Sequence, residues 1–288
     1  MRHAYLIMVH HEFEILQHLL TALDDERNDL YIHVDKQVDT LPILHTKKAG
    51  LVVLENRIRV YWGDVSQVAA ELRLFDAASK NGPYTYHHVL SGVDMPLKSQ
   101  DYIHNFFALH QGKEFIGFTQ GNLAEQIDRK VRRYHLFPRH FRAKQRPLDV
   151  SRAFLRALCL RLQYLSGYRR HTKMTFKKGT SWVSVTSHFV DLLLACKTEI
   201  MQLYQNSFCA DEIFIHTFCW TSVFRERLFD PADEGHGCMR LVQWRNGQIV
   251  DWENKDYELL MNSDALFARK FNSGNMEVVD RILKAVRI

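Results

Sequence analysis

The sequence predicts an α/β fold with a mostly parallel central sheet flanked by helices. Two short apolar runs, residues 4–9 and 30–34, have the length and composition of buried strands. Between them, apolar side chains recur with helical spacing over residues 15–23. A strand, a helix and a second strand in this order form a βαβ unit, whose two strands run parallel in one sheet. The same alternation continues along most of the chain.

Further elements follow in chain order. Residues 51–54 predict a third strand, and the run 62–66 turns the chain. Asp64 or Ser66 is a candidate cap for a helix that extends to about Lys80. The next predicted elements are a strand at 87–90, a helix at 100–109, a strand at 114–118, a short strand at 180–185 and a helix ending near 204. Because no internal repeat or low-complexity tract interrupts this pattern, residues 1–288 are expected to form a single domain.

The composition is typical of a globular protein. Of the 288 residues, 46% are hydrophobic and 25% are charged, which excludes a largely disordered chain. The first apolar run is too short for a signal peptide, and no run reaches the ~18 residues of a spanning helix. The five cysteines are odd in number and form no CxxC pair, so free thiols are expected rather than disulfides or a zinc site. These features predict a protein of the cytoplasm or of the inner face of the cell membrane.

Charge is unevenly distributed along the chain. Residues 129–178 contain 16 Lys and Arg and a single acid, Asp149, whereas the remainder contains 22 basic and 32 acidic residues. We expect a basic helical insertion here, with a helix over residues 151–164. Arg152, Arg156 and Gln163 lie near one face of this helix, and Arg161 lies on the opposite face. The partner of this segment stays open among an anionic membrane, a polyanionic acceptor, nucleic acid and the acidic body of the same chain.

Two aspartates follow apolar strands. Asp35 ends the strand at 30–34, and Asp94 comes shortly after the strand at 87–90. Ligands of open α/β sheets bind at the carboxyl ends of the strands. An aspartate placed there can accept hydrogen bonds from ribose hydroxyls, a sugar or a base edge. A nucleotide or nucleotide-sugar site is therefore the leading expectation, and the alternative is that each aspartate only begins a turn.

Several well-known motifs are absent from the sequence. It has no GxxxxGK[ST] loop, no GxGxxG after the first strand, no GxSxG and no HExxH. Their absence argues against P-loop, Rossmann, hydrolase and zincin enzymes. The cluster His10-His11-Glu12 with Glu14 offers metal-binding side chains, but neighbouring residues at a strand exit point in different directions. No metal site is expected.

Several ordered segments together resemble one known family. The matching runs keep one order along nearly the whole chain: residues 4–10, 31–36, 62–66, 90–97, 178–182, 210–212 and 266–271. In these runs the chain is similar to the core-2/I-branching β-1,6-N-acetylglucosaminyltransferase and peptide O-xylosyltransferase family, as a bacterial-type member. The resemblance implies a GT-A-like fold, a UDP-sugar donor, inversion at the anomeric carbon and no DXD metal motif. Neither a divalent metal nor another cofactor is therefore expected.

The resemblance places the catalytic base in an Asp-Glu pair. Glu212 matches the family's base, and Asp211, the second catalytic candidate, is expected to be its capping or supporting partner. An inverting transfer needs a base for the proton of the acceptor hydroxyl while the anomeric carbon is attacked opposite the departing diphosphate. Animal members usually carry a proline where this chain has Ala210, a difference that concerns helix entry rather than chemistry. The alternative is that both acids only favour a helix N-terminus.

Cationic side chains must stabilise the leaving diphosphate, because the sequence has no Asp-x-Asp motif. Arg269 and Lys270 match the family positions that contact the UDP diphosphate, and Arg240 is a third candidate. Asp35 and Asp94 would serve the uridine-ribose side and the donor or acceptor sugar. The alternative for the Arg-Lys pair is a solvated surface position.

Three further residues are candidates for contact with the acceptor or a sugar. Trp62 would stack on a sugar ring, with core packing as the alternative. Ser181 and Trp182 fall where the family lines the acceptor site. Xylosyltransferases carry an aspartate near the position of Ser181, and this chain does not, which disfavours protein xylosylation.

We therefore expect a metal-independent inverting glycosyltransferase that moves a sugar, N-acetylglucosamine before others, from a UDP-sugar. The expected acceptor is a hydroxyl of a surface glycan or of a lipid-linked glycan, with peripheral contact to an anionic membrane and no nucleic acid partner. Two alternatives stay open. One is a nucleic-acid-binding protein that uses residues 129–178 and their aromatic side chains, and the other is a catalytically silent relative that only binds a nucleotide-sugar.

Overall fold

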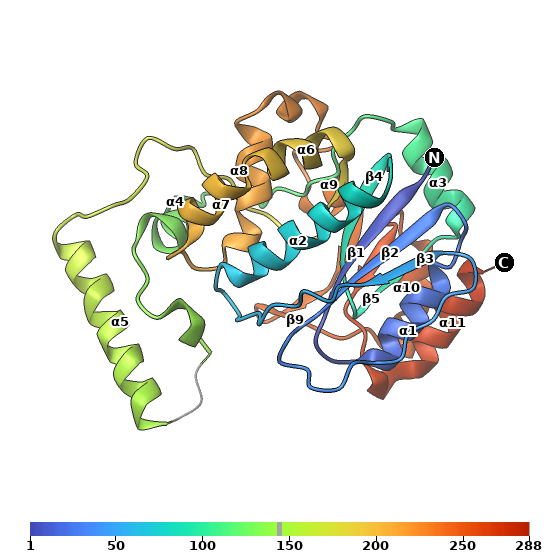
Figure 1. Cartoon of the computed structure of the whole chain (residues 1–288), viewed down its shortest axis with the longest axis horizontal. Helices are drawn as coiled ribbons and strands as arrows, with labels where there is room; N and C mark the ends of the chain where they lie inside the picture. The colour runs from blue at the N-terminus through green and yellow to red at the C-terminus, as the bar shows by residue number, and fades with distance from the viewer. Residues whose placement is uncertain (143–145, 288) are drawn as a thin grey trace.

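The computed structural model describes residues 1–142 and 146–287, and its centre is a five-stranded sheet (Figure 1). The strands lie in the order β3-β2-β1-β4-β6. Their bounds are β1 His3–Val9, β2 Asn28–Val34, β3 Gly50–Val53, β4 Tyr86–Ser91 and β6 Ser184–Thr186. The pairs β1/β2, β1/β4 and β2/β3 are parallel, and β6 runs antiparallel to β4. The prediction of a mostly parallel sheet is confirmed.

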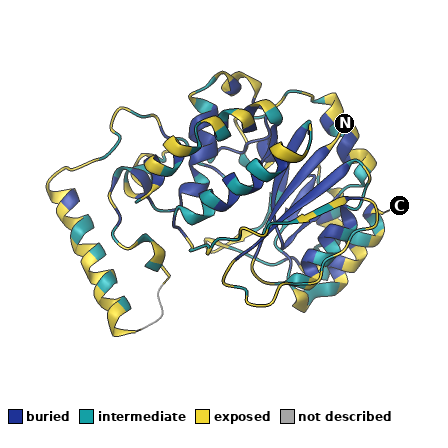
Figure 2. Ribbon diagram, in the orientation of Figure 1, coloured by how far each residue is buried: buried dark blue, intermediate teal, exposed yellow. Residues whose placement is uncertain are grey.

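Helices cover both faces of this sheet. One face carries α1 (Phe13–Ala22), α3 (Gln100–Leu109), α10 (Tyr257–Asn262) and α11 (Met276–Val286), and the other carries α2 (Ser66–Asn81), α6 (Ser187–Ala195), α7 (Lys197–Tyr204) and α8 (Phe214–Trp220). The alternation along β1 explains the two layers: Tyr5 and Ile7 belong to the first apolar cluster, and Ala4 and Leu6 to the second. The strands β1, β2, β4 and β6 are accordingly buried on both sides, whereas the edge strand β3 is partly exposed (Figure 2).

A second, three-stranded sheet continues from the carboxyl end of β4. It consists of β5 (Asp94–Pro96), β10 (Phe267–Arg269) and β7 (Arg240–Val242), with β10 in the middle, antiparallel to β5 and parallel to β7. A hairpin of β8 (Trp244–Arg245) and β9 (Gln248–Ile249) follows β7. The register pairs Asp94 directly with Arg269, although these residues are far apart in the sequence.

Three predicted elements differ from the structure. The strand expected at 180–185 is reduced to β6, Ser184–Thr186. The expected strand at 114–118 forms only isolated bridges, Glu114 with Leu228, Phe115 with Ser184 and Phe118 with Gly179. It therefore meets a different segment at each bridge and cannot build a ladder. The helix expected to end near 204 is divided at Cys196 into α6 and α7.

The remaining short helices lie mostly in connecting segments. They are α4 (Ala124–Ile127), η1 (Asp128–Arg132), η2 (Pro138–His140), η3 (Ala210–Glu212), η4 (Val223–Arg227), α9 (Glu234–Cys238), η5 (Asn254–Asp256) and η6 (Ser273–Asn275). Among the described residues, none of the helices is both long and apolar enough to cross a membrane.

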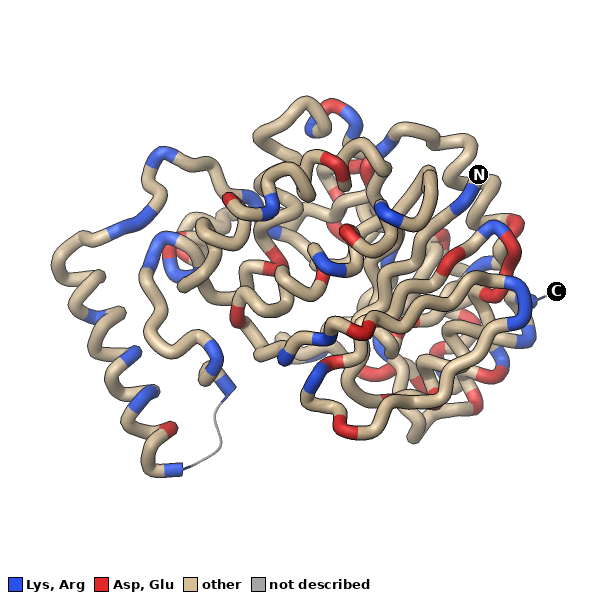
Figure 3. The backbone as a smooth tube through the Cα atoms, viewed as in Figure 1, with Lys and Arg blue, Asp and Glu red and all other residues tan. Residues whose placement is uncertain are grey.

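The longest helix stands apart from the sheet. It is α5 (Pro147–Leu165), and it lies beyond α4 and α7 at one end of the molecule (Figure 1). Blue segments dominate this end in Figure 3, where the basic residues of the predicted insertion lie. The division into one domain with an insertion at 129–178 stays a prediction from the sequence.

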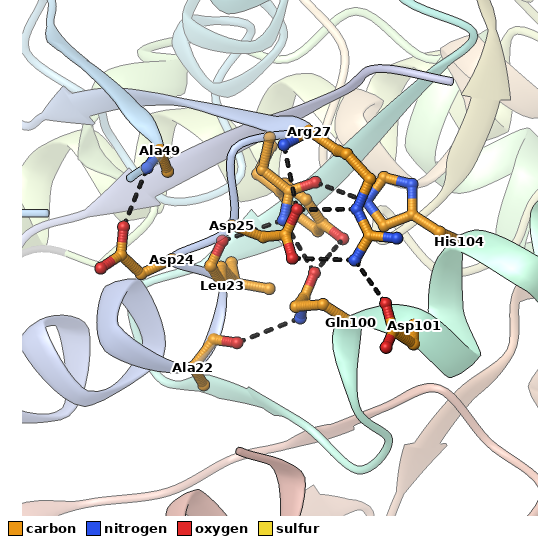
Figure 4. Close-up of polar contacts among 11 residues, drawn as sticks. Ala22, Leu23, Asp24, Asp25, Arg27, Ala49, Gln100, Asp101 and His104 are labelled. Atoms are coloured by element: carbon orange, nitrogen blue, oxygen red, sulfur yellow. Dashed lines mark hydrogen bonds and ion pairs between the residues drawn. The ribbon is translucent and has the colours of Figure 1, made fainter. Parts of the chain in front are cut away.

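A polar network closes the opposite edge of the sheet, where β2 begins (Figure 4). Arg27 donates to both carboxylate oxygens of Asp25, at 2.7 and 2.8 Å, and to Asp101 at 2.7 Å. Gln100 accepts a hydrogen bond from the Asn28 amide and donates one to the Ala22 carbonyl. These contacts join the end of α1, the start of β2 and α3, and they leave the carboxyl edge of the sheet for ligands.

Candidate active site

The turn between β4 and β5 holds Asp94 in a buried position. Its carboxylate accepts hydrogen bonds from the backbone N–H and the hydroxyl of Ser91, both at 2.9 Å. The Arg269 Nε atom lies 3.8 Å from Asp94 Oδ1, and the side chain of Asp94 is 2% exposed. The structure therefore brings together two residues that the sequence assigned to the donor.

Arg269 is a buried cation with unused hydrogen-bond donors. Its guanidinium lies over the indole ring of Trp182, 4.0 Å from the ring centroid. Among the described residues, neither Nε nor Nη1 has a hydrogen-bond partner. Burial lowers the pKa of Arg269, and the nearby Asp94 opposes this shift. Because buried polar groups are almost always paired, these donors indicate a site for an anion.

Lys270 is more accessible and faces a different acid. Its Nζ atom lies 3.5 Å from Asp251 Oδ1, and the side chain is 37% exposed. Trp252 fixes the backbone here, since its indole N–H donates to the Arg269 carbonyl at 2.8 Å and its backbone N–H donates to the Lys270 carbonyl at 3.0 Å. Trp252 itself is buried. It is a positioning residue that sequence reasoning missed.

Glu212 lies on η3 and faces two lysines. Its Oε2 atom accepts a hydrogen bond from Lys130 Nζ and lies 3.4 Å from Lys178 Nζ. The Glu212 side chain is 32% exposed, whereas those of Lys130 and Lys178 are 9% and 14% exposed. Both lysines come from the basic segment and were not predicted as site residues. Lys178 belongs to a run that resembles the family, but its position in that run does not reveal a contact with Glu212.

Asp211 supports this site rather than capping a helix. Its Oδ2 atom accepts hydrogen bonds from Ser181 Oγ at 3.0 Å and from Gln67 Nε2 at 3.3 Å. No side-chain cap is formed at η3. Burial, and then the charge of Glu212, raise the pKa of Asp211 to about 6, while the Ser181 hydroxyl opposes the shift.

Gln67, at the start of α2, connects Asp211 to the turn that carries Trp62. Its Oε1 atom accepts a hydrogen bond from the Gly63 backbone N–H at 2.9 Å. Gly63 has a φ of 76°, and a Cβ atom there would lie 2.6 Å from the ring of Phe208. A non-glycine residue would therefore displace the turn. Gln67 also lies in no run that carries the family resemblance, so the sequence offered no signal for it.

A second buried acid lies on α2. Glu71 is 1% exposed, and among the described residues neither of its carboxyl oxygens has a hydrogen-bond partner. Burial, and then the charge of Asp211, raise the pKa of Glu71 well above its ordinary value. A protonated Glu71 avoids placing a second negative charge behind Asp211.

Trp62 and Ser181, two predicted contacts of the acceptor or a sugar, differ in exposure and in their neighbours. Trp62 is 43% exposed and is not a core residue; Arg142 lies over its ring at 4.1 Å and Phe208 meets it edge-on. Ser181 is buried against Asp211. Its neighbour Trp182 is the residue that contacts Arg269. Two consecutive residues thus connect the acidic pair with the buried cation.

Two predicted donor residues have their polar groups engaged within the chain. The Asp35 carboxylate accepts hydrogen bonds from the backbone N–H groups of Gln37, at 2.8 Å, and Val60, at 3.3 and 3.4 Å. This geometry is that of a residue that begins a turn. Arg240 donates to the Cys238 carbonyl at 2.7 Å and to Ser184 Oγ at 2.9 Å. Burial lowers its pKa to about 10. Donor contacts by either residue stay predictions from the sequence.

Comparison with known proteins decides the family. A family model described as "Branch: Core-2/I-Branching enzyme" matches residues 3–266. The chain belongs to the core-2/I-branching enzyme family. It is 24% identical over 296 residues to a mouse N-acetyllactosaminide β-1,6-N-acetylglucosaminyl-transferase, covering 93% of this chain and 68% of that protein. It is also 24% identical over 309 residues to human xylosyltransferase 2, covering 97% of this chain and 33% of that protein.

This core-2/I-branching enzyme is therefore a glycosyltransferase, and its mixed α/β fold agrees with the GT-A-like fold that the resemblance implied. The chain spans about two thirds of the mouse enzyme and one third of the human xylosyltransferase. The names of these relatives differ in the transferred sugar. The names of the relatives alone therefore do not decide which sugar this chain transfers.

In the part of the chain that the structure describes, no group of three or more His, Cys, Asp or Glu side chains is placed to bind one metal ion. All five cysteines are free thiols. Metal independence stays a prediction, and it is tested by the titration proposed below.

Proposed function

We propose that this glycosyltransferase moves a sugar from a UDP-sugar to an acceptor hydroxyl with inversion at the anomeric carbon and without a divalent metal. One observation carries the proposal: adjacent residues Ser181 and Trp182 contact Asp211 and Arg269, respectively. The acidic pair that contains the proposed base Glu212 and a largely buried cation therefore lie on either side of one short segment. An inverting transfer needs this combination of a base and a charge that stabilises the leaving group.

In the proposed reaction, Glu212 accepts the proton of the acceptor hydroxyl. The hydroxyl oxygen forms a bond to the anomeric carbon, while the bond from that carbon to the diphosphate oxygen breaks and its electron pair leaves with UDP. Lys130 and Lys178 hold Oε2 of Glu212, so Oε1 is the oxygen proposed to receive the proton. Asp211, held by Ser181 and Gln67, supports the backbone of η3.

The departing diphosphate is proposed to bind Arg269 and Lys270. Arg269 supplies a largely buried positive charge whose Nε and Nη1 atoms have no partner among the described residues, and its burial strengthens the attraction to an anion. Lys270, the next residue along the chain, adds a more accessible ammonium group. The proximity of Asp94 to Arg269 orients the guanidinium and supports a role for Asp94 in donor binding.

N-acetylglucosamine is the sugar we propose. The β-1,6-N-acetylglucosaminyl-transferase of mouse is matched over 68% of its length, against 33% for the human xylosyltransferase. The position of Ser181, where xylosyltransferases carry a nearby aspartate, supports the same choice. The proposed acceptor is a hydroxyl of a surface glycan or of its lipid-linked precursor.

Calorimetric titration of UDP, with UMP for comparison, tests the donor site. We expect UDP to bind in EDTA with an affinity that added manganese leaves unchanged, and to bind more tightly than UMP. The double variant Arg269→Ala/Lys270→Ala should weaken UDP binding by about 100-fold or more, because it removes two charge-assisted contacts. The exposed pair Lys47→Ala/Lys48→Ala is the matched control and should bind UDP like the wild type.

Three outcomes contradict parts of this proposal. Absence of UDP binding under both conditions overturns the nucleotide-sugar site. Binding that requires manganese overturns metal independence. UDP binding without transfer from UDP-N-acetylglucosamine or UDP-xylose to glycan acceptors favours a catalytically silent relative.

A further inference from the structure

Helix α5 packs on the rest of the chain through its polar side. Gln163 exchanges hydrogen bonds with the backbone of Tyr134, at 2.7 and 2.9 Å. Arg152 Nη1 lies 3.4 Å from His140 Nδ1, and Arg156 donates to the His140 carbonyl at 3.3 Å. This reverses the usual arrangement of a surface helix, in which the apolar side faces the body.

The outward side of α5 is consequently apolar. Helical spacing places six of its large hydrophobic residues within an arc of about 120°, in which Ser151 is the one polar side chain. They are Leu148, Phe154, Leu155, Leu158, Leu162 and Leu165, and they are between 43% and 77% exposed. Leu155, Leu158 and Leu162 also line a shallow groove of about 480 Å³ that ends at Tyr168. We call these six residues the leucine face.

Positive charge surrounds the leucine face. Arg146 lies at the amino end of α5 and Arg161 borders the arc, and both are exposed; Arg169, after the carboxyl end, is paired with Asp128. Asp149 is the one acid in α5, and it is paired with Arg152. An apolar helix face bordered by arginines fits the boundary between lipid headgroups and acyl chains, where leucines enter the acyl region and guanidinium groups reach the phosphates.

We propose that the leucine face of α5 docks this glycosyltransferase on an anionic lipid surface. Charge complementarity selects this occupant over a second copy of the chain, because two α5 helices packed through their leucines would bring their arginines together. The inference does not depend on the proposed donor or reaction.

Nucleic acid fits this region less well. Binding of single strands uses aromatic rings as stacking platforms for bases. Arginines of the same chain already lie over three of the rings of this segment: Arg133 over Tyr164 at 4.1 Å, Arg156 over Phe141 at 4.9 Å, and Arg170 over Tyr134 at 5.7 Å.

Flotation with lipid vesicles tests the docking surface. The vesicles contain either phosphatidylcholine alone or equal parts of phosphatidylcholine and phosphatidylglycerol. We expect the full chain to float with the anionic vesicles and not with the neutral ones. The variant Leu155→Ser/Leu158→Ser/Leu162→Ser should bind about tenfold or more weakly, because these side chains no longer enter the acyl region.

Matched variants separate docking from stability. The triple variant Leu41→Ser/Leu109→Ser/Leu259→Ser changes three leucines that are 46%, 82% and 57% exposed on other elements, and it should float like the wild type. Arg161→Ala should reduce binding to anionic vesicles by roughly fivefold, the contribution of one cation near such a surface. The UDP affinity measured by calorimetry should be the same in all of these variants as in the wild type. This second measurement distinguishes failure of this inference from failure of the donor site.

Other results would overturn the inference. A folded wild-type chain that does not float with anionic vesicles excludes lipid docking. If sedimentation velocity instead shows a dimer that the α5 serine variant dissociates, the leucine face is an interface between two copies. If a labelled single-stranded DNA binds the wild type, loses affinity in Arg161→Ala, and the chain does not bind vesicles, the basic segment is a nucleic-acid surface.

Discussion

Arg269 lies over the indole of Trp182 with its guanidinium 4.0 Å from the ring centroid, and its Nε atom is 3.8 Å from Asp94. The ring covers one side of the cation, and the carboxylate orients it from another. Neither Nε nor Nη1 has a hydrogen-bond partner among the described residues. This combination keeps a largely buried positive charge in one place without neutralising it through a direct hydrogen bond.

Replacing Trp182 by leucine is therefore expected to weaken UDP binding by about 10- to 30-fold, because a desolvated cation–π contact is worth about 2 kcal/mol. Trp182→Phe should retain most of the affinity, since it keeps an aromatic face. Titration calorimetry measures both. The control is Trp244→Leu on β8, where the side chain is 63% exposed. Equal UDP affinity of the wild type and of Trp182→Leu would show that Trp182 does not contribute to the donor site.

Glu212→Gln is expected to lower kcat by about 10²- to 10⁴-fold, the range for loss of a general base. Its UDP affinity should stay close to that of the wild type, because Glu212 is proposed to act on the acceptor. The measurement is UDP release with a UDP-sugar and a glycan acceptor. Glu199→Gln on α7 is the control and should be fully active. A Glu212→Gln variant with wild-type kcat would remove Glu212 from the role of base.

The elements predicted best are those that local pattern defines. The strands β1, β2 and β4 and the helix α3 match their predicted ranges within two residues at each end, because each is a continuous apolar run or a clear helical period. The strand predicted at 114–118 has the same composition but is wrong, since pairing depends on neighbours that periodicity does not reveal.

The acidic pair and the Arg-Lys pair could be singled out from the sequence, but their surroundings could not. Lys130 reaches Glu212 across 82 positions of sequence, and Trp252 reaches the backbone of Arg269 from another segment. Such contacts follow from tertiary packing. The same limit applies to α5: spacing correctly placed Arg152, Arg156 and Gln163 on one face, but it did not indicate that this face would be the inner one.

Asp211 should make stability depend on pH in a specific direction. Its pKa rises from 3.8 to about 6 on folding, so its favourable contribution is complete below about pH 4 and is lost as pH rises through 6. We expect this residue to lower the free energy of unfolding by about 2 kcal/mol between these limits. Asp211→Asn keeps an oxygen that can accept from Ser181 and should remove this loss. Urea unfolding of both proteins from pH 4 to 7 measures the difference, and parallel pH profiles would contradict it.

Asp25 should have the opposite effect at the other edge of the sheet (Figure 4). The hydrogen bonds from Arg27 lower the pKa of Asp25 to about 2, so its contribution is complete above about pH 4 and is lost as pH falls through 2. Asp25→Asn is expected to lower the free energy of unfolding by about 1–2 kcal/mol at pH 7, after allowance for partial exposure. The deficit should shrink at pH 3. Thermal unfolding at both values tests this, with UDP affinity at pH 7 as the control, since this edge lies away from the proposed donor site. An equal deficit at both values would mean that packing, and not charge, gives Asp25 its role.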